Sequence, residues 1–317
     1  MPVPPDLLTL THYLDGEDIP DSIHELCESL LHLYPKGIQA ILFYGSCLRS
    51  DSDVDGIVDL YVIVDRYGSI YKNSWLTIAN TLLPPNVFYL EIPYQKRTIR
   101  AKYAILSIKD FERSTSKQWF HSYFWARFAQ PTKVVFAKTP VIQKKVYAAL
   151  AQAILTFTMR TIYHIPNPFD ALGMWKAGLS LTYQAELRTE RSGRIEQLLT
   201  AAPDYYQQTG DIAIANLSIP IVRSKPDEPE HYTTEHDSFN RRLSQGAWIL
   251  RRLQGKLLSV LRLLKGFFTF QGGVAYILWK IERHSGVKIT LTPWQQRHPL
   301  LSCPTVLWQL YHKGAFR

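Results

Sequence analysis

Short apolar segments bounded by turn residues recur through the first 140 positions, and this pattern is typical of buried strands. The clearest are IQAILFYGS and GIVDLYVIVD, which are rich in Val, Ile and Leu. The polar and aromatic stretch 110–130 predicts a helix between later strands. The first part of the chain is therefore expected to be mixed α/β, with strands over 38–46, 56–65, 86–94, 99–108 and 132–137.

From position 141 the apolar spacing becomes helical. The segment 141–165 predicts a long helix that ends at a pair of prolines, because proline ends helices. Segments 169–190 and 192–207 predict further helices, and 222–238, which holds two prolines and five acids, predicts a surface loop. The expected organisation is an α/β domain at 1–140, a mostly helical second domain at 141–240 and a basic amphipathic C-terminal region at 241–317.

A basic helix is predicted over about 240–265. Its leucines share one face, whereas its basic residues point away from them; the leucines are Leu250, Leu253, Leu257, Leu261 and Leu264, and the basic residues are Arg251, Arg252, Lys256, Arg262 and Lys265. Such a helix suits an anionic membrane surface. A helix that packs its leucines on a core and leaves its basic face in water has the same pattern, so both interpretations stay open.

The net positive charge of the chain indicates a polyanionic partner. The chain has 36 basic and 27 acidic residues, a net charge of +9, and residues 1–30 hold acids but no Lys or Arg. The three scattered cysteines predict neither a disulfide framework nor a zinc site, which favours the cytoplasm. We expect no transmembrane helix, because no apolar stretch is long enough, and membrane contact would be peripheral. No RNA-recognition motif is present, so no specific nucleic acid partner is expected.

The segment FYGSCLRSDSDVDGIVDLYVIVD (43–65) carries the strongest chemical signal. Gly45 and Ser46 follow a strand, where backbone N–H groups can approach phosphate oxygens closely. Twelve residues separate Ser46 from Asp59, which lies on the next predicted strand and could hold Mg²⁺. This is the pattern of polymerase-β-type nucleotidyltransferases. A common Gly-Ser turn followed by a solvated acidic loop is the alternative interpretation.

A second metal ligand is less clear. The position two residues after Asp59, where the pattern usually has another acid, is Tyr61. Asp65 is expected on the same strand face as Asp59 by period-two alternation, at the far end, and Asp55 in the loop is the second choice. We therefore expect Asp59 to bind Mg²⁺ together with Asp65 or Asp55.

Several motifs resemble, in the same order, those of the mitochondrial-type CDP-diacylglycerol synthases, or phosphatidate cytidylyltransferases, of the nucleotidyltransferase superfamily. FYGS and VDLYVIVD are similar to that family's Tyr-Gly-Ser and Leu-Asp-Phe-x-Phe-x-Val-Asp, with Asp59 and Asp65 in place. The family has an aromatic or apolar residue where Tyr61 stands. The resemblance covers about 43–268, and departures from the family at Cys47 and Ala185 mark a remote relative.

Four further blocks extend this resemblance. The first block, IRAKYAILS (99–107), resembles the family's Ile-Lys-Tyr-Gly-Val. The second, HSYFWARFAQPTKVV (121–135), resembles its Leu-Tyr-x-Ala-Gly-Arg-x-x-Lys-Pro-Val-Lys. The third, LRLLKGFF (261–268), resembles its Arg-x-x-x-Lys-Gly. AGLSLTYQAELR resembles Ala-Gly-Leu-Ser-Tyr-x-Gly-Asp-x-Arg, with Glu186 in place of Asp. The basic residues that these blocks match to the family are Lys102, Arg127, Lys133, Arg188 and Lys265.

The resemblance implies Mg²⁺-dependent transfer of CMP from CTP to phosphatidate, which gives CDP-diacylglycerol and pyrophosphate at a membrane surface. It places Gly45 and Ser46 at the triphosphate, Asp59 with Asp65 at Mg²⁺, and Lys102 and Arg127 at phosphate charge. Lys133, Arg188 and Lys265 are implied as further binding residues. The residues themselves leave open another acceptor, such as a protein side chain, an RNA end or a small phosphorylated molecule. A non-catalytic nucleotide- or RNA-binding protein is the third possibility.

Overall fold

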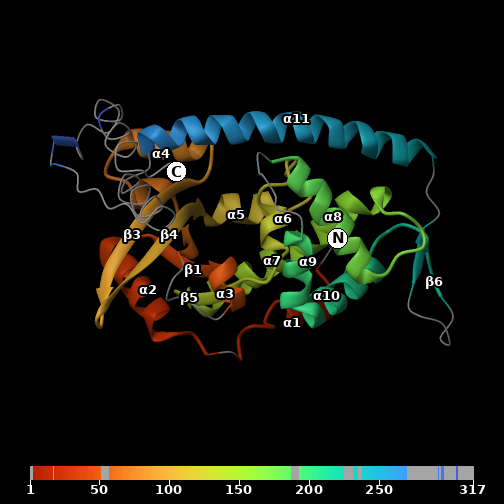
Figure 1. Cartoon of the computed structure of the whole chain (residues 1–317), viewed down its shortest axis with the longest axis horizontal. Helices are drawn as coiled ribbons and strands as arrows, with labels where there is room; N and C mark the ends of the chain where they lie inside the picture. The colour runs from red at the N-terminus through yellow and green to blue at the C-terminus, as the bar shows by residue number, and fades with distance from the viewer. Residues whose placement is uncertain are drawn as a thin grey trace.

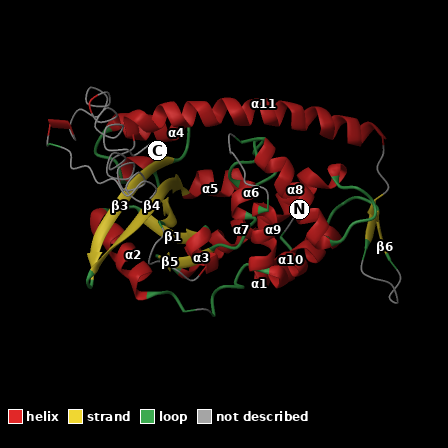
Figure 2. Ribbon diagram, in the orientation of Figure 1, coloured by secondary structure: helices red, strands yellow, loops and turns green. Residues whose placement is uncertain are grey.

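The computed structural model describes residues 3–16, 18–50, 57–186, 193–224, 231–234 and 238–269, with residues 292, 294, 295 and 305. These residues form a mixed α/β fold, in which a five-stranded sheet lies at one end and a group of helices at the other (Figure 1). One long helix runs beside both (Figure 2). The expected fold class, a mixed sheet followed by mostly helical chain, is confirmed.

The sheet contains all five predicted strands, in the order β3-β4-β2-β1-β5. Only β2 and β4 are parallel, and the other neighbouring pairs are antiparallel. The strands are β1 (Ile38–Tyr44), β2 (Val58–Val64), β3 (Asn86–Tyr94), β4 (Arg97–Ser107) and β5 (Lys133–Ala137).

The parallel pair requires a crossover, because parallel strands cannot be joined by a tight turn. The chain passes from β2 through the short helix η1 (Tyr67–Ser69), helix α4 (Ser74–Leu82) and β3 before it returns as β4. Buried asparagines fix this crossover to the sheet. Asn80 donates to the Ile105 carbonyl at 3.0 Å, and Asn86 donates to the Leu76 carbonyl at 2.9 Å.

Alternating side chains of β2 bury both faces of the sheet. Leu60 and Val62 pack with helix α2 (Asp21–Leu33) in one core cluster. Tyr61 and Ile63 join the other cluster, which also holds residues of α5 (Ile108–Thr115), α6 (Trp125–Phe128) and α7 (Pro140–Thr161). The second cluster continues into α8 (Ala171–Gln184) and α10 (Pro203–Ala215), so sheet and helices share one core.

Two expectations about helices and one about a loop were wrong in detail. The predicted helix 110–130 is α5 and α6 with irregular chain between them; Phe124 at the end of this chain and Trp125 at the start of α6 are buried. The predicted helix 192–207 is α9 (Arg194–Ala201) followed by α10, because Pro203 starts a new helix. The segment expected to be a loop holds the antiparallel strands β6 (Ile221–Arg223) and β7 (Tyr232–Thr234). The remaining short helices are α1 (Pro5–Leu10), α3 (Ser46–Ser50) and η2 (Ile162–His164).

Helix α11 (Ser238–Thr269) is the predicted basic helix, and it runs along one side of the molecule from α8 to α4 (Figure 1). Its inner face is held by buried polar contacts. Arg251 is 1% exposed, donates from Nε to the Phe120 carbonyl at 2.7 Å, and stacks 4.6 Å from the Trp248 ring centroid. Trp248 donates from Nε1 to the Arg160 carbonyl at 2.9 Å. Aromatic faces and carbonyls thus take the place of carboxylates around Arg251.

The outer face of α11 is apolar. Five leucines there are between 41% and 64% exposed; they are Leu250, Leu253, Leu257, Leu261 and Leu264, which we call the outer leucine face. The core-facing alternative for this helix is therefore wrong, because Arg251, Arg262 and Lys265 turn towards the protein and the leucines turn away from it. Among the described helices, none is both long and apolar enough to cross a membrane.

Gly255 is expected to be essential for the docking of α11. A Cβ at this position would lie 2.2 Å from the carbonyl oxygen of Ala185, whereas a Cβ at Gly246 would have nothing within 4 Å. Gly255→Ala should lower the free energy of unfolding by about 1–3 kcal/mol, because the backbone of α8 must move. Gly246→Ala should raise it by about 0.5–1 kcal/mol, as in other open helical positions. Urea unfolding measures both, and equal effects would contradict the close contact.

Candidate functional site

Three polar side chains stand in one row across adjacent strands of the sheet. Asp59 on β2 is paired in register with Tyr44 on β1 and with Lys102 on β4, so all three project from the same face. The Lys102 Nζ lies 3.4 Å from Asp59 Oδ1. The side chains of Lys102 and Asp59 are 37% and 26% exposed, so a ligand in solvent can reach this pair.

The Gly-Ser turn lies directly against Asp59. Gly45 has a φ of +97°, which favours glycine, and a Cβ there would stand 2.8 Å from Asp59 Oδ2. Ser46 begins helix α3 and is exposed. Cys47, which follows it, donates from Sγ to the Ile57 carbonyl at 3.3 Å and so ties the turn to the chain entering β2. The structure therefore brings Gly45 to Asp59, with Ser46 next to it in the chain.

Arg127 joins this row from helix α6. Its Nη1 donates to the Tyr44 hydroxyl at 3.4 Å, and its guanidinium carbon lies 4.8 Å from the Tyr123 ring centroid. Burial, followed by the charge of Asp59, raises the pKa of Tyr44 to about 12, so this phenol stays protonated at neutral pH. Tyr44 thus links the sheet carboxylate to the arginine of α6.

Tyr61 forms the floor of the site. It is 0% exposed, and its ring centroid lies 5.0 Å from that of Tyr44 and 4.7 Å from that of Phe128. Burial raises the pKa of its hydroxyl, which has no hydrogen-bond partner in the described part of the chain. A tyrosine thus occupies the place where a second carboxylate of the usual pattern would stand.

Three residues of this region, Arg262, Glu186 and Tyr123, were not assigned to the site from the sequence. Arg262 reaches in from α11, with its guanidinium carbon 4.1 Å from the ring centroid of Tyr123. Its Nε donates to the Pro84 carbonyl at 3.1 Å. Glu186, at the end of α8, acts electrostatically on both Arg127 and Arg262. The only advance signal for Arg262 was its place on a basic helix, and Tyr123 was hidden in an aromatic run.

Asp65 is not brought to Asp59. It follows β2 at the far end, where its carboxylate accepts hydrogen bonds from the Arg66 backbone N–H at 2.7 Å and from Ser69 Oγ at 3.1 Å. Six residues of extended chain span about 20 Å, which is too far for one Mg²⁺ to reach both carboxylates. Asp55, the other expected ligand, lies outside the described residues, as does Arg188.

Lys133 and Lys265 also lie apart from the row. Lys133 is 4% exposed and pairs with Phe43 in register, so it projects from the opposite face to Tyr44. Lys265 donates to the carbonyls of Leu83 and Pro85 after helix α4, the latter at 2.7 Å. Burial, and then the charge of Arg262, lowers the pKa of Lys265 to about 7. Lys265 therefore fastens α11 to the loop before β3.

The donor set suits a magnesium ion that arrives with phosphate. Asp59 offers carboxylate oxygens beside the Gly45–Ser46 turn. Within the described ranges, no three His, Cys, Asp or Glu residues gather as a ready-made metal cage. Mg²⁺ commonly takes one or two protein carboxylates and completes its shell with water and substrate phosphates. Asp59 fits that role.

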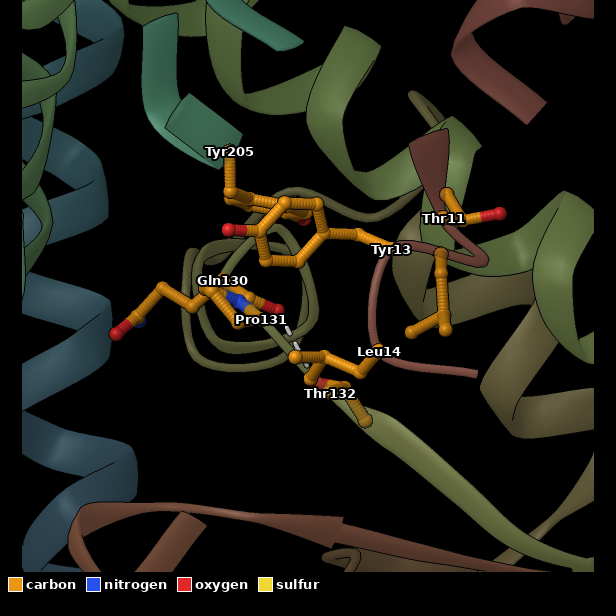
Figure 3. A pocket seen from close by; sticks show the side chains of 8 residues that line it. Thr11, Tyr13, Leu14, Gln130, Pro131, Thr132 and Tyr205 are labelled. Atoms are coloured by element: carbon orange, nitrogen blue, oxygen red, sulfur yellow. Dashed lines mark hydrogen bonds between the residues drawn. The ribbon is translucent and has the colours of Figure 1, made fainter. Parts of the chain in front are cut away.

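A small pocket lies elsewhere in the molecule. Tyr13, Gln130, Thr132 and Tyr205 are among the residues that line it (Figure 3). Its volume of about 10 Å³ is close to that needed for one water molecule. It includes no residue of the Asp59 row, so we assign it no part in the site.

Gly45→Ala should disrupt the site from its turn. The left-handed backbone and the contact with Asp59 both oppose a side chain, so we expect the free energy of unfolding to fall by about 1–2 kcal/mol or more. We also expect weaker nucleoside triphosphate binding in equilibrium dialysis. Gly68→Ala is the matched control, because a Cβ there has nothing within 4 Å. Unchanged stability and binding in Gly45→Ala would contradict the close approach to Asp59.

Comparison with known proteins gives a limited result. No family model matches the sequence, and no curated protein matches it. Among solved structures, a nucleotidyltransferase-like protein from Exiguobacterium sibiricum 255-15 is similar at 13% sequence identity and a TM-score of 0.23. The match covers 67% of this chain and 97% of that one. At this TM-score the similarity carries no argument about function, which rests on the geometry of the site.

Proposed function

We propose that the protein is a nucleotidyltransferase that uses Mg²⁺ and acts at the Asp59 row. The observation that carries this proposal is the contact between the Gly45 turn and Asp59, with Lys102 3.4 Å from the same carboxylate. A glycine turn offers backbone N–H groups to phosphate, and an adjacent carboxylate offers oxygen to a metal. Nucleotidyl transfer needs this combination of donors, because its catalysis is mainly positioning and charge stabilisation.

In the proposed reaction, Gly45 and Ser46 hold the triphosphate of the nucleotide. A phosphate oxygen of the acceptor attacks the α-phosphorus and forms a new P–O bond, while the bond to the β-phosphate bridging oxygen breaks and pyrophosphate leaves. Lys102 and Arg127 offset the negative charge that gathers on the phosphates. Tyr44, kept protonated by its raised pKa, holds Arg127 beside the reacting groups. A bound Mg²⁺, held by Asp59, would supply Lewis acidity to the phosphate oxygens.

We further propose CTP as the nucleotide and phosphatidate as the acceptor. The support is the order of motifs from FYGS to LRLLKGFF, which resembles that of the phosphatidate cytidylyltransferases. The outer leucine face of α11 agrees with a substrate that lies in a membrane, since an exposed apolar stripe of this kind suits a lipid surface. Exposed Lys256 and Arg242 on the same helix would meet anionic headgroups.

The reaction is tested with labelled CTP, ATP, GTP and UTP, Mg²⁺ and vesicles that contain phosphatidate. We expect pyrophosphate release that requires CTP and phosphatidate, and we expect Asp59→Asn to lower kcat by about 100-fold or more. Thermal unfolding of this variant should change little, because a partly exposed ion pair contributes little to stability. Turnover without phosphatidate would point to another acceptor, and nucleotide binding without turnover would contradict an enzyme.

Membrane association is tested by flotation with vesicles of phosphatidylcholine and phosphatidylglycerol. Leu257→Asp combined with Leu261→Asp should abolish flotation, because two charges would enter the apolar layer, while nucleotide binding is retained. The matched control is Leu33→Asp, which changes a leucine that is 53% exposed on α2. Equal flotation of the double variant and the control would contradict a membrane role for α11.

A further inference from the structure

Two arginines from distant parts of the chain stack on one tyrosine. Arg127 comes from α6 and Arg262 from α11, and their guanidinium carbons lie 4.8 Å and 4.1 Å from the ring centroid of Tyr123. The two groups are close enough for the charge of Arg127 to lower the pKa of Arg262, although burial is the larger cause. Like charges repel, so this pairing has an energetic cost that the fold must offset.

No carboxylate in the described residues forms an ion pair with either arginine within 4.0 Å. The carboxylate that acts on both is Glu186, and it does so through space. The field at the neighbouring His121 is positive. Burial, then Arg262 and Arg251, lower the pKa of His121 to about 3, so His121 stays neutral and accepts a hydrogen bond from Trp119 Nε1 at 2.9 Å. Half-buried cations without paired anions are costly, and a bound anion would remove this cost.

The arginines also have hydrogen-bonding capacity left over. Arg262 uses Nε on the Pro84 carbonyl, which fixes the side chain and leaves its terminal nitrogens without hydrogen bonds in the described chain. The buried Nε of Arg127 has no hydrogen-bond partner in the described chain, and its Nη1 donates a long hydrogen bond to the Tyr44 hydroxyl. The hydroxyl of the fully buried Tyr61 is unpartnered in the same region. Planar guanidinium groups in this state are suited to phosphate oxygens.

We propose that Arg127 and Arg262 form a clamp for the phosphate group of the acceptor, and that Arg262 is a substrate-binding residue supplied by α11. This inference rests on the proposed function and deepens it. In the proposed function, the Gly45 turn and Lys102 serve the nucleotide triphosphate beside Asp59. Arg262 brings one half of the clamp from α11, the helix whose outer face carries the leucines. An acceptor phosphate would enter from the α11 side.

A purely structural role for Arg262 makes a different prediction. Its contacts with Pro84 and Tyr123 could serve only to fasten α11, as the contacts of Lys265 do. Loss of Arg262 would then lower stability and leave substrate affinity unchanged. Kinetic constants and unfolding must therefore be measured on the same variants.

The kinetic experiment compares Arg262→Gln, Arg262→Lys and the control Arg113→Gln in the full chain. Arg113 is exposed and stacks 5.3 Å from the Trp119 ring centroid, so its loss removes a similar stacking contact away from the clamp. Arg262→Gln should raise the KM for phosphatidate in vesicles by roughly 10–100-fold, as expected for a lost charged hydrogen bond. The KM for CTP should stay within about twofold. Arg262→Lys should be intermediate, and the control should match the wild type.

A binding experiment tests the clamp separately from turnover. Inorganic phosphate should raise the unfolding temperature of the wild type and of Arg113→Gln, but not of Arg262→Gln. Vesicles with and without phosphatidate then distinguish a lipid headgroup from free phosphate as the preferred source. If the wild type shows phosphate binding that depends on Arg262 but no nucleotidyl transfer, the clamp stands and the proposed function fails.

Three outcomes would overturn the clamp. The first is a rise in the KM for CTP in Arg262→Gln with an unchanged KM for phosphatidate, which would assign the arginine to the nucleotide. The second is a lower unfolding temperature with both KM values unchanged, which would make Arg262 structural. The third is equal phosphate stabilisation of wild type and Arg262→Gln.

Discussion

The register between β1, β2 and β4 is the constraint on which the site depends. It places Tyr44, Asp59 and Lys102 abreast on one face, although β2 runs antiparallel to β1 and parallel to β4. A slip of one residue in β2 would turn Asp59 towards the core that packs on α2 and bring Leu60 to the site. The other parts attach to this row: Gly45 closes over Asp59, and Arg127 reaches Tyr44. Strand pairing that buries two apolar faces therefore also aligns the polar groups at one point on the sheet.

Helix α11 is bound to the protein by cationic side chains as well as by the buried Trp248. Arg251 stacks between aromatic rings, Arg262 stacks on Tyr123, and Lys265 donates to backbone carbonyls. Each buried cation loses part of its hydration shell, and ring faces or carbonyl oxygens take the place of that water. This replacement limits the cost of desolvating the charge. The same contacts place positive charge next to the sheet. The same basic residues therefore attach this helix and contribute positive charge to the site, so a substitution that changes one of these also changes the other.

Sequence reasoning predicted the strands of the sheet, because apolar runs define them. It named Asp59 from its spacing after the Gly-Ser turn and Lys102 from the family resemblance, whereas the pairing of the two side chains is known only from the structure. It could not place Asp65, because period-two alternation gives the face of a residue but not its distance, and β2 ends at Val64. It also missed Arg262 as a site residue. A helical wheel separates leucines from basic residues without saying which side meets the protein, and only close contacts such as Gly255 with Ala185 decide this.

The two faces of α11 also set the distance between the outer leucine face and the guanidinium of Arg262. An α-helix with its side chains is about 10–12 Å across, and Arg262 lies on the side opposite the outer leucine face. With those leucines at the boundary of the acyl chains, the guanidinium would stand roughly one helix diameter above that boundary, at or beyond the outer edge of a headgroup layer that is about 5–8 Å thick. The helix would then act as a spacer that fixes the height of the reacting groups. A lipid would then have to rise part of the way out of the bilayer for its phosphate to meet the guanidinium.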